Sequence, residues 1–361
     1  MPAGRQRVWA SPGLDWLRGW SPLLKSLVLA VVLALVLGGL GLALAGAPVS
    51  SGSRERVIFE VRAGEGAASI AANLERAGLI RDRFEFRALS TLLGWNGRLK
   101  SGRYEMSPGY STWRALRKIG RGEVITVALT IPEGFALIQI EALLVEKGWT
   151  SQEAFRAALR DLDAAGELPF PPTRRSGFIE PYEGLLSPNT YFFEETASPE
   201  LIARTMALAT TAIFTPDLLA RTKELGMTPF EVLTLASIIE REAAVSEERP
   251  IISSVYHNRL RIGMKLDACP TVLYVVGKFA GEPLLFVDLE VESPYNTYRN
   301  AGLPPGPICS PGLASIRAAL YPADTDYFYF VSKNNGTHQF SRTVEEHNRA
   351  VREYQGGSSG T

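Results

Sequence analysis

The chain has 361 residues, of which 46% are hydrophobic and 21% charged, and its 38 Lys and Arg balance 38 Asp and Glu. This length allows two or more compact domains, and a formal net charge of zero gives no reason to expect a nucleic-acid partner. The three His and two Cys form no CxxC or HExxH spacing, so no metal site is expected.

An uncharged segment near the N-terminus is long enough to span a membrane. Residues 26–47, SLVLAVVLALVLGGLGLALAGA, form a run of 22 without a charge, and a helix of this length covers the roughly 30 Å of a bilayer core. Four Lys and Arg against one Asp precede it, which favours a cytoplasmic N-terminus. A cleaved signal peptide is the alternative, but its apolar region is only about 7–15 residues long. We expect residues 1–25 in the cytoplasm, 26–47 as a transmembrane helix and 48–56 as a spacer outside the plasma membrane.

A weak internal duplication of small α+β units occupies residues 57–160. Residues 57–80 have the pattern of a strand, a Gly-Glu-Gly turn and an amphipathic helix, and residues 127–150 repeat it with a Pro-Glu-Gly turn. This alignment pairs Glu65 of the first turn with Glu133 of the second. Units of this size resemble LysM modules, which bind glycans that contain N-acetylglucosamine; a simple scaffold is the alternative.

The rest of the chain is expected to form one large domain. Residues 161–177, rich in Pro, Gly and charge, are typical of a linker. Residues 178–355 follow, and they close with a hairpin around an Asn-Gly turn and a helix capped by Thr343. Residues 356–361 are expected to be a disordered tail. The predicted fold class is α+β, with a LysM-like α+β region and a mixed α/β catalytic domain.

Two acids, Glu240 and Glu242, lie one residue apart near the end of a predicted helix. Thr228, Pro229 and Glu231 give its first turn a capping box and a favourable proline. At about 100° per residue, Glu240 falls beside the apolar face and Glu242 nearer the solvated side. Loss of hydration penalises a charged carboxyl, so we expect the pKa of Glu240 to rise toward about 6, as a general acid needs. A structural pair with a buried Arg is the alternative.

Two further loops have a composition that suits a glycan groove. Residues 182–193 and 292–312 are dense in Tyr, Asn, Thr, Pro and Gly, and sugars bind by stacking on aromatic rings and by hydrogen bonds to their hydroxyls. The candidate sugar contacts are Tyr191, Thr271, Tyr295 and Asn296.

The two cysteines, Cys269 and Cys309, enclose a loop of about 40 residues. An exported domain permits a disulfide, which in the loop-entropy model stabilises the fold by about 4 kcal/mol. Two free thiols are equally compatible with the sequence.

Several motifs in a fixed order resemble the endolytic murein transglycosylases, the membrane-anchored bacterial lytic transglycosylases. They are LASIIEREA, NRLRIGMKLDACPTVLY, ESPYNTY, GLPPGPI and THQFS…EHN. The resemblance covers nearly the whole chain and implies cleavage of peptidoglycan at the β-1,4 bond between N-acetylmuramic acid and N-acetylglucosamine. No water is added and no cofactor is needed, and the product ends in 1,6-anhydro-N-acetylmuramic acid. The family's acid, the first Glu of its motif, falls on Glu240, which would protonate the glycosidic oxygen and then deprotonate the muramoyl C6 hydroxyl.

The resemblance also implies a place in the cell and partners. The enzyme would end the elongation of nascent strands at the plasma membrane, beside peptidoglycan synthases. The chain departs from the family at Asn189 and Cys269, where the motifs usually have Asp, and at Cys309, where they have a small residue. The joint appearance of the two cysteines favours a disulfide.

Two other functions are compatible with the sequence. A hydrolytic muramidase needs a second carboxylate about 5–9.5 Å from Glu240, and Glu183 and Glu292 are the candidates. A non-catalytic, membrane-anchored scaffold would bind peptidoglycan without cleaving it.

Overall fold

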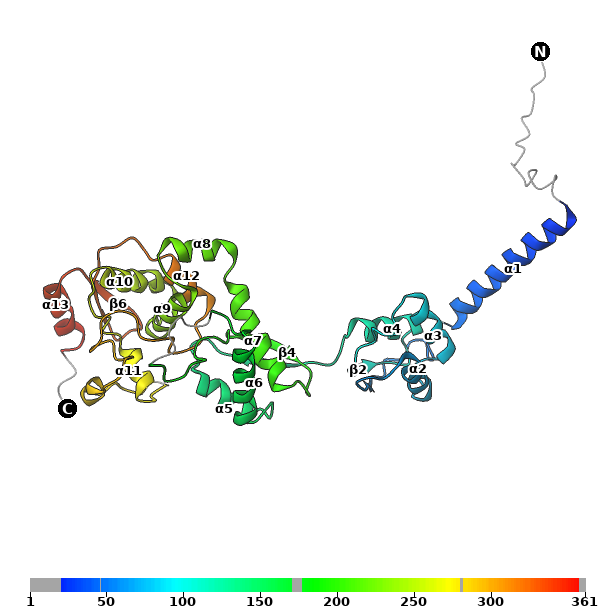
Figure 1. The fold of residues 1–361 in the computed structure, drawn as a ribbon, viewed down its shortest axis with the longest axis horizontal. Coiled ribbons are helices and arrows are strands. Elements are labelled where there is room, and N and C mark those ends of the chain that lie inside the picture. The colour runs from blue at the N-terminus through cyan, green and yellow to red at the C-terminus, as the bar shows by residue number, and fades with distance from the viewer. Residues whose placement is uncertain (1–20, 46, 171–176, 280–281, 357–361) are drawn as a thin grey trace, which may run out of the picture. The chain divides into compact units, whose positions relative to one another are not determined.

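The structure is a computed structural model that describes residues 21–45, 47–170, 177–279 and 282–356 (Figure 1). The chain divides into two compact units, residues 1–125 and 126–361. The predicted cytoplasmic segment before residue 21 and the tail from residue 357 lie outside the described residues.

Helix α1 (Pro22–Ala45) covers most of the segment for which we predict a transmembrane helix. Its side chains from residue 34 onward lie outside the described part of the structure. Among the residues that are described, no helix is long and apolar enough to cross a membrane.

The first unit contains a β-α-α-β motif followed by one more helix. Its elements are β1 (Val57–Val61), α2 (Ala67–Arg76), α3 (Arg83–Leu92), β2 (Gly102–Met106) and α4 (Thr112–Arg121). Strands β1 and β2 pair in antiparallel register, with Phe59 opposite Tyr104. Alternate strand residues point inward, so Phe59 and Tyr104 pack in the same core as Phe86 of α3.

The predicted duplication is confirmed, and it extends further than the sequence indicated. The second copy is β3 (Val127–Ile131), α5 (Leu137–Glu146), α6 (Gln152–Ala164) and β4 (Asn189–Phe193). As in the first copy, the two strands pair in antiparallel register. The Tyr191 hydroxyl donates to the Ser187 carbonyl at 2.6 Å, and the Tyr104 hydroxyl of the first copy donates to the Lys100 carbonyl at 2.7 Å. Residues 189–193, which we expected in a loop, therefore form the closing strand of the second copy.

The structure corrects the alignment of the two turns. Strands β1 and β3 begin 70 residues apart, which pairs Gly64 with Gly134. Both glycines have positive φ, 78° and 75°, a backbone conformation that favours glycine. Glu65 is therefore not the counterpart of Glu133. It accepts hydrogen bonds from the Arg62 amide and the Ser69 hydroxyl beside α2, whereas Glu133 has other neighbours.

The domain boundary lies at residue 125, before the second copy, and not in the predicted linker. Helix α6 occupies the start of that linker, up to Ala164. The ring of Phe170 packs edge-on against Phe214 with 4.6 Å between centroids. Because β3 pairs with β4, the second copy belongs to the larger unit.

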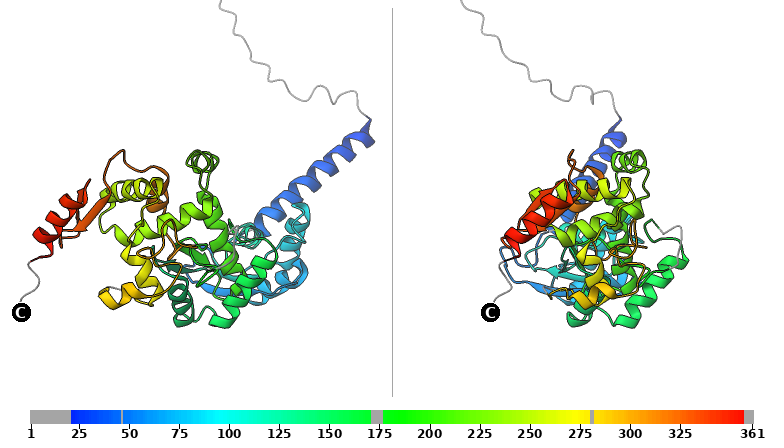
Figure 2. Two further views of the ribbon diagram at one scale, coloured as in Figure 1. Left: turned by 60° about the vertical axis from the view of Figure 1, so that its left-hand side comes forward. Right: turned by 90° about the vertical axis from the view of Figure 1, so that its left-hand side faces the viewer.

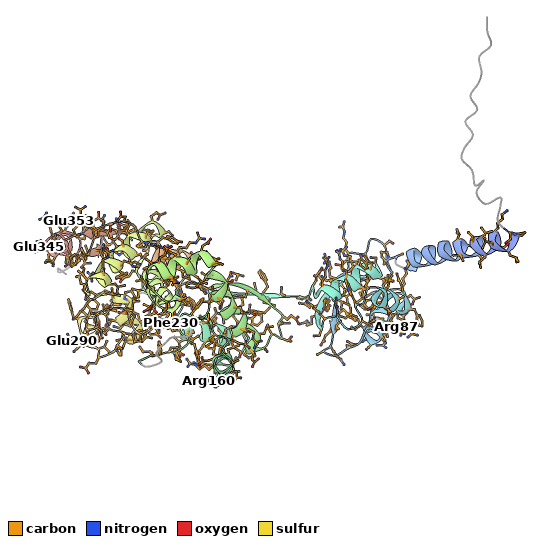
Figure 3. The ribbon with its side chains drawn as sticks, turned by 45° about the horizontal axis from the view of Figure 1, so that its top comes forward. Arg87, Arg160, Phe230, Glu290, Glu345 and Glu353 are labelled. Atoms are coloured by element: carbon orange, nitrogen blue, oxygen red, sulfur yellow. The ribbon has the colours of Figure 1, made fainter. Side chains whose placement is uncertain are left out.

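The remainder of the larger unit surrounds helix α9. Its elements are α7 (Pro199–Ile213), α8 (Pro216–Glu224), α9 (Pro229–Glu242), η2 (Ser246–Glu248), α10 (Arg249–Arg261), α11 (Cys269–Val275), η3 (Phe286–Glu290), α12 (Leu313–Leu320), β5 (Tyr329–Ser332), β6 (His338–Ser341) and α13 (Val344–Tyr354). Helix α9 contacts α8, α10, α11 and α12 (Figure 1). Phe230 and residues 232–239 are all buried, and Phe230 lies inside the body while Glu290 and Glu345 lie at its surface (Figure 3). A helix buried on all sides has no single apolar face, so the helical wheel alone could not place its acids.

Local predictions for this unit are largely confirmed. The Thr228–Glu231 capping box is present at the start of α9. Strands β5 and β6 form the predicted hairpin, and α13, capped by Thr343, packs on it (Figure 2). The α+β class is confirmed, and the described part of the larger unit is mainly helical with two two-stranded antiparallel sheets.

Candidate active site

Glu240, the acid indicated by the motif, lies in a charged cluster at the end of α9. Its side chain is only 7% exposed, and its Oε1 is 3.4 Å from Arg249 Nη2. Its Oε2 accepts a hydrogen bond of 3.0 Å from the Gly312 amide. Arg249 also donates to the Ser315 and Ser246 hydroxyls. The Glu240 side chain is poorly hydrated, as predicted. It is paired with an arginine, however, which is the structural alternative that we considered.

A second carboxyl, Glu133, belongs to the same cluster. It comes from the turn between β3 and α5 and packs against Gly312, where it would clash with any Cβ. Burial and the negative charge of Glu240 raise the pKa of Glu133, while Arg249 lowers it. Next to it, the Gly134 amide donates to the Ser310 carbonyl at 2.9 Å. The sequence reasoning missed this contact, because the misaligned repeat paired Glu133 with Glu65.

Glu242 points into a different environment from the one we expected. It borders a cavity of about 520 Å³ formed by residues of α9, α10, β5, β6, α13 and the loop before α11. The Tyr256 hydroxyl of α10 donates to its Oε1 at 3.2 Å. Burial raises the pKa of Glu242 to about 7, although the hydrogen bond from Tyr256 lowers it. The expectation that Glu242 faces water is wrong, because α10 and the C-terminal hairpin cover this end of α9.

The residues around this cavity come from several of the motifs that carry the family resemblance. NRLRIGMKLDACPTVLY supplies Arg259, Asp267 and Cys269, ESPYNTY supplies Tyr298, and THQFS…EHN supplies His338 and His347. Segments up to about 100 residues apart in sequence therefore meet beside Glu242. Both aromatic rings and polar groups line the space, a composition that suits sugars.

Arg259 holds one wall of the cavity together. Its guanidinium donates to the carbonyls of Phe328, Lys265 and Leu266 at 2.6–3.0 Å and pairs with Asp267 at 3.0 Å. Asp267 has a φ of 47°, a strained conformation for a non-glycine residue, which persists only where surrounding contacts fix it. The arginine is one contact that holds it, and the Asp267 amide also donates to the Thr297 carbonyl at 3.3 Å.

The four predicted sugar contacts do not line the cavity. Tyr191 is 7% exposed, and Thr271, Tyr295 and Asn296 are fully buried. The polar groups of three of them bond within the protein: the Tyr191 hydroxyl donates to the Ser187 carbonyl, the Thr271 hydroxyl donates to the Ala268 carbonyl at 2.7 Å, and the Asn296 amide donates to two backbone carbonyls at 2.9 Å. Tyr295 packs against Tyr274, with 5.4 Å between ring centroids. The expectation that these residues touch sugar is therefore wrong, since the aromatic loops fold inward.

The two carboxylates considered for a hydrolase are also elsewhere. Glu183 is buried and accepts hydrogen bonds from the Leu137 amide at the start of α5 and from the Tyr274 hydroxyl. Burial raises its pKa to about 8. This carboxyl caps a helix inside the core, where it is out of reach of a glycan strand. The Glu292 side chain is 89% exposed, 3.8 Å from Arg299. Neither lines the cavity beside Glu242.

The cysteines are free thiols, so the disulfide is not formed. Cys269 Sγ lies 3.0 Å from the Tyr298 hydroxyl at the cavity, and Cys309 Sγ lies 3.4 Å from the Ser237 carbonyl in the core. Each sulfur has a partner within the fold, which satisfies its weak hydrogen-bonding capacity.

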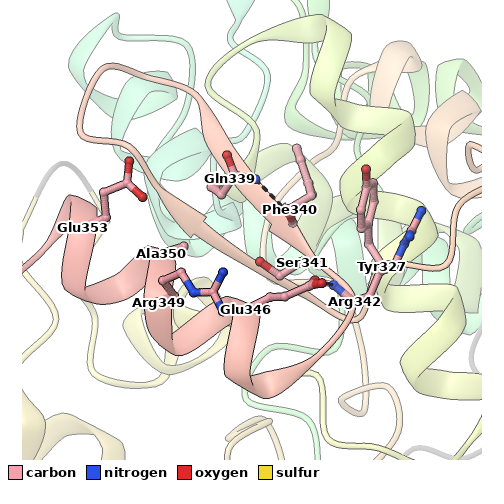
Figure 4. A pocket seen from close by; sticks show the side chains of 9 residues that line it. All are labelled: Tyr327, Gln339, Phe340, Ser341, Arg342, Glu346, Arg349, Ala350 and Glu353. Atoms are coloured by element: carbon pink, nitrogen blue, oxygen red, sulfur yellow. Dashed lines mark hydrogen bonds between the residues drawn. The ribbon is translucent and has the colours of Figure 1, made fainter.

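Two other cavities border neither acid of α9. One of about 360 Å³ lies between β6 and α13, where Arg342, Glu346, Arg349 and Glu353 surround an open charged notch (Figure 4). The other, of about 720 Å³, is lined by residues of α7, α8 and α12. Within the described ranges, no group of three or more His, Cys, Asp or Glu is arranged to hold a metal ion.

The chain is similar to proteins of known family. Residues 59–353 match the model of the YceG-like family. The chain is 34% identical over 316 residues to the endolytic murein transglycosylase of Bacillus subtilis (strain 168), which covers 85% of this chain and 87% of that protein. It is 30% identical over 331 residues to the endolytic murein transglycosylase of Streptococcus pneumoniae serotype 2 (strain D39), covering 85% of this chain and 60% of that protein. A crystal structure of a yceG-like protein from Listeria monocytogenes has a TM-score of 0.57 at 34% identity, over 82% of this chain and all of the other.

Proposed function

The chain belongs to the YceG-like family, and from this premise we propose that it cleaves glycan strands of peptidoglycan as an endolytic murein transglycosylase. The bond broken is the β-1,4 bond between N-acetylmuramic acid and N-acetylglucosamine, and no water is consumed. The similarity to two proteins named endolytic murein transglycosylase, over 85% of this chain, supports this function.

Within this function, Glu242 is the general acid. The observation that carries the assignment is its position on a cavity of about 520 Å³ built from the family motifs. Burial raises its pKa to about 7. In a large fraction of the molecules the carboxyl therefore keeps its proton near neutral pH, as a general acid must. Glu240 remains the alternative that the motif position indicates. We rank it second because its two carboxylate oxygens already face Arg249 and the Gly312 amide.

The reaction needs only one carboxyl. Protonated Glu242 donates to the glycosidic oxygen while the bond to C1 of the muramoyl residue breaks and an oxocarbenium-like state forms. The resulting carboxylate then takes the proton of the C6 hydroxyl, whose oxygen bonds to C1 and gives the 1,6-anhydro end. Tyr256, which donates to Oε1 of Glu242, stabilises the carboxylate between the two steps.

The products distinguish this reaction from hydrolysis. We expect mass spectrometry of digested peptidoglycan to find new strand ends as 1,6-anhydro-N-acetylmuramic acid, because the C6 hydroxyl replaces water as the nucleophile. These ends are lighter than reducing ends by about 18 Da, the mass of one water. Reducing ends would identify a hydrolytic muramidase. Intact strands bound to the protein would identify a scaffold.

The pH dependence of the cleavage rate should identify the general acid. Because the protonated carboxyl is the active form and burial raises the pKa of Glu242 to about 7, we expect the cleavage rate to fall as the pH rises through about 7. Tyr256→Phe removes a hydrogen bond that lowers this pKa, so its falling limb should move to higher pH. The measurement is the initial rate of muropeptide release between about pH 5 and 9. A limb that stays in place in Tyr256→Phe would point to an acid other than Glu242.

Four statements about the cell stay predictions from the sequence. They are the cytoplasmic N-terminus, the anchor over residues 26–47, the termination of nascent strands and the association with peptidoglycan synthases.

A further inference from the structure

The two units carry opposite charge. The first unit, residues 1–125, contains eighteen Lys and Arg and nine Asp and Glu, a formal charge of +9, and residues 57–125 contribute twelve and seven of these. Residues 126–361 contain twenty Lys and Arg and twenty-nine Asp and Glu, a formal charge of −9. The zero net charge of the whole chain therefore hides a basic unit and an acidic one, and the candidate acid lies in the acidic unit.

Two of these basic residues lie with an exposed aromatic ring on one side of α4. Ala115, Leu116 and Ile119 of this helix are buried in the core. Trp113, Arg117 and Arg121 are exposed, and a spacing of four residues places them along one stripe of the helix. The helix thus presents an aromatic ring followed by two guanidinium groups.

The loop between α3 and β2 adds to this stripe. The indole of Trp95 stacks on that of Trp113, with 6.3 Å between centroids and 22° between planes. The same indole lies against Gly120 of α4, and Lys100 lies against Gly122 at its end. Arg98 follows in the turn that Trp95 begins. We call this surface the basic aromatic face: Trp95, Arg98, Lys100, Trp113, Arg117 and Arg121.

The four cations of this face have no acidic partner. Among the described residues, no Asp or Glu lies within ion-pair distance of Arg98, Lys100, Arg117 or Arg121. Trp113 is 43% exposed, which is a large exposed fraction for an aromatic residue of a small unit. Unpaired cations beside exposed rings are the pattern that binds a polyanion containing flat or ring-shaped groups.

We propose that the basic aromatic face binds a peptidoglycan strand, with sugar rings stacked on Trp113 and carboxylates of the stem peptides paired with Arg117 and Arg121. The inference rests on the proposed function, because that function makes the strand the polymer this chain encounters. The stem peptides make the strand anionic, so the unit of charge −9 repels it at long range. A basic face in the same chain offsets this repulsion and holds the substrate.

The test uses the full chain with Glu240→Gln and Glu242→Gln together, so that binding is measured without cleavage whichever acid is catalytic. Each face variant is added to this background: Trp113→Ala, or Arg117→Gln with Arg121→Gln. The control is Arg76→Gln with Arg87→Gln, which removes the same charge from exposed positions on α2 and α3 of the same unit; Arg87 is labelled in Figure 3. Co-sedimentation with purified insoluble peptidoglycan gives the affinity, and circular dichroism checks the fold of each variant.

We expect both face variants to bind peptidoglycan about 10-fold more weakly, a change typical of one lost stacking contact or two lost ion pairs, and the control to bind normally. On chitin, a polymer of N-acetylglucosamine that carries no carboxylate, only Trp113→Ala should weaken binding. Equal losses in the control and the arginine variant would overturn the proposal by showing a non-specific charge effect. Arginine variants that lose binding to vesicles of anionic phospholipid but keep full binding to peptidoglycan would also overturn it, and would assign the face to a membrane. Because the background is inactive, neither outcome depends on the cleavage reaction.

Discussion

Glu242→Gln is expected to lower the rate of strand cleavage by about 10²–10⁴-fold, the usual contribution of a general acid. The amide keeps the size of the side chain and can still accept the hydrogen bond from Tyr256, but it has no proton to donate at neutral pH. Glu240→Gln is expected to lower the rate by less than about 10-fold, because it disturbs only the charged cluster with Arg249 and Gly312. The measurement is the initial release of soluble fragments from labelled peptidoglycan.

The comparison between the two variants decides the assignment. Loss of cleavage in Glu240→Gln with near-normal cleavage in Glu242→Gln would return the role of acid to the motif position. Thermal unfolding of both variants is the control, because Glu240→Gln removes the negative charge that is paired with Arg249 in a poorly hydrated place and is expected to cost about 1–3 kcal/mol of stability. The cleavage rate of a variant can be interpreted when the variant is folded at the assay temperature.

Arg259→Met is expected to lower the free energy of unfolding by about 3–5 kcal/mol, because each poorly hydrated acceptor that loses its donor costs about 1–3 kcal/mol. The side chain is 8% exposed and bonds three backbone carbonyls and Asp267. Methionine fills a similar length but leaves those acceptors without a donor. It also removes one of the contacts that hold Asp267 at a φ of 47°. Urea unfolding followed by tryptophan fluorescence measures the change.

A matched substitution at the surface separates this effect from simple loss of an arginine. Arg299 pairs with Glu290 at 3.3 Å and lies near Glu292, both in exposed positions. Arg299→Met is expected to cost less than about 1 kcal/mol, as exposed ion pairs do. Similar losses at the two arginines would mean that Arg259 does not hold the cavity wall.

Features that depend on neighbours in sequence could be predicted. The capping box of Thr228 and Glu231 involves residues three apart, and the β5–β6 hairpin closes through a short turn. The two β-α-α-β copies were visible because each begins with a strand and a helix in direct succession. In each case the sequence window that shows the pattern also contains its partners.

The environment of the two acids could not be predicted in the same way. A helical wheel describes one helix, and it placed Glu242 beside the exposed Glu231. The actual neighbours of Glu242 come from α10 and the C-terminal hairpin, about 14 to 100 residues later. The prediction that Tyr191 contacts sugar failed for a related reason. Its ring belongs to the core of the second copy, as Tyr104 belongs to the core of the first, and only the pairing of β4 with β3 reveals this.

The pairing of β3 with β4 sets a limit on how this protein can be divided. A truncated enzyme that begins at residue 178 would expose an unpaired strand edge at β4, a template for aggregation. It would also lack the turn that bonds Ser310 beside the Glu240 cluster. A fragment that starts at Thr126 keeps both contacts, so a module that looks like a detachable sugar-binding domain is here part of the larger unit.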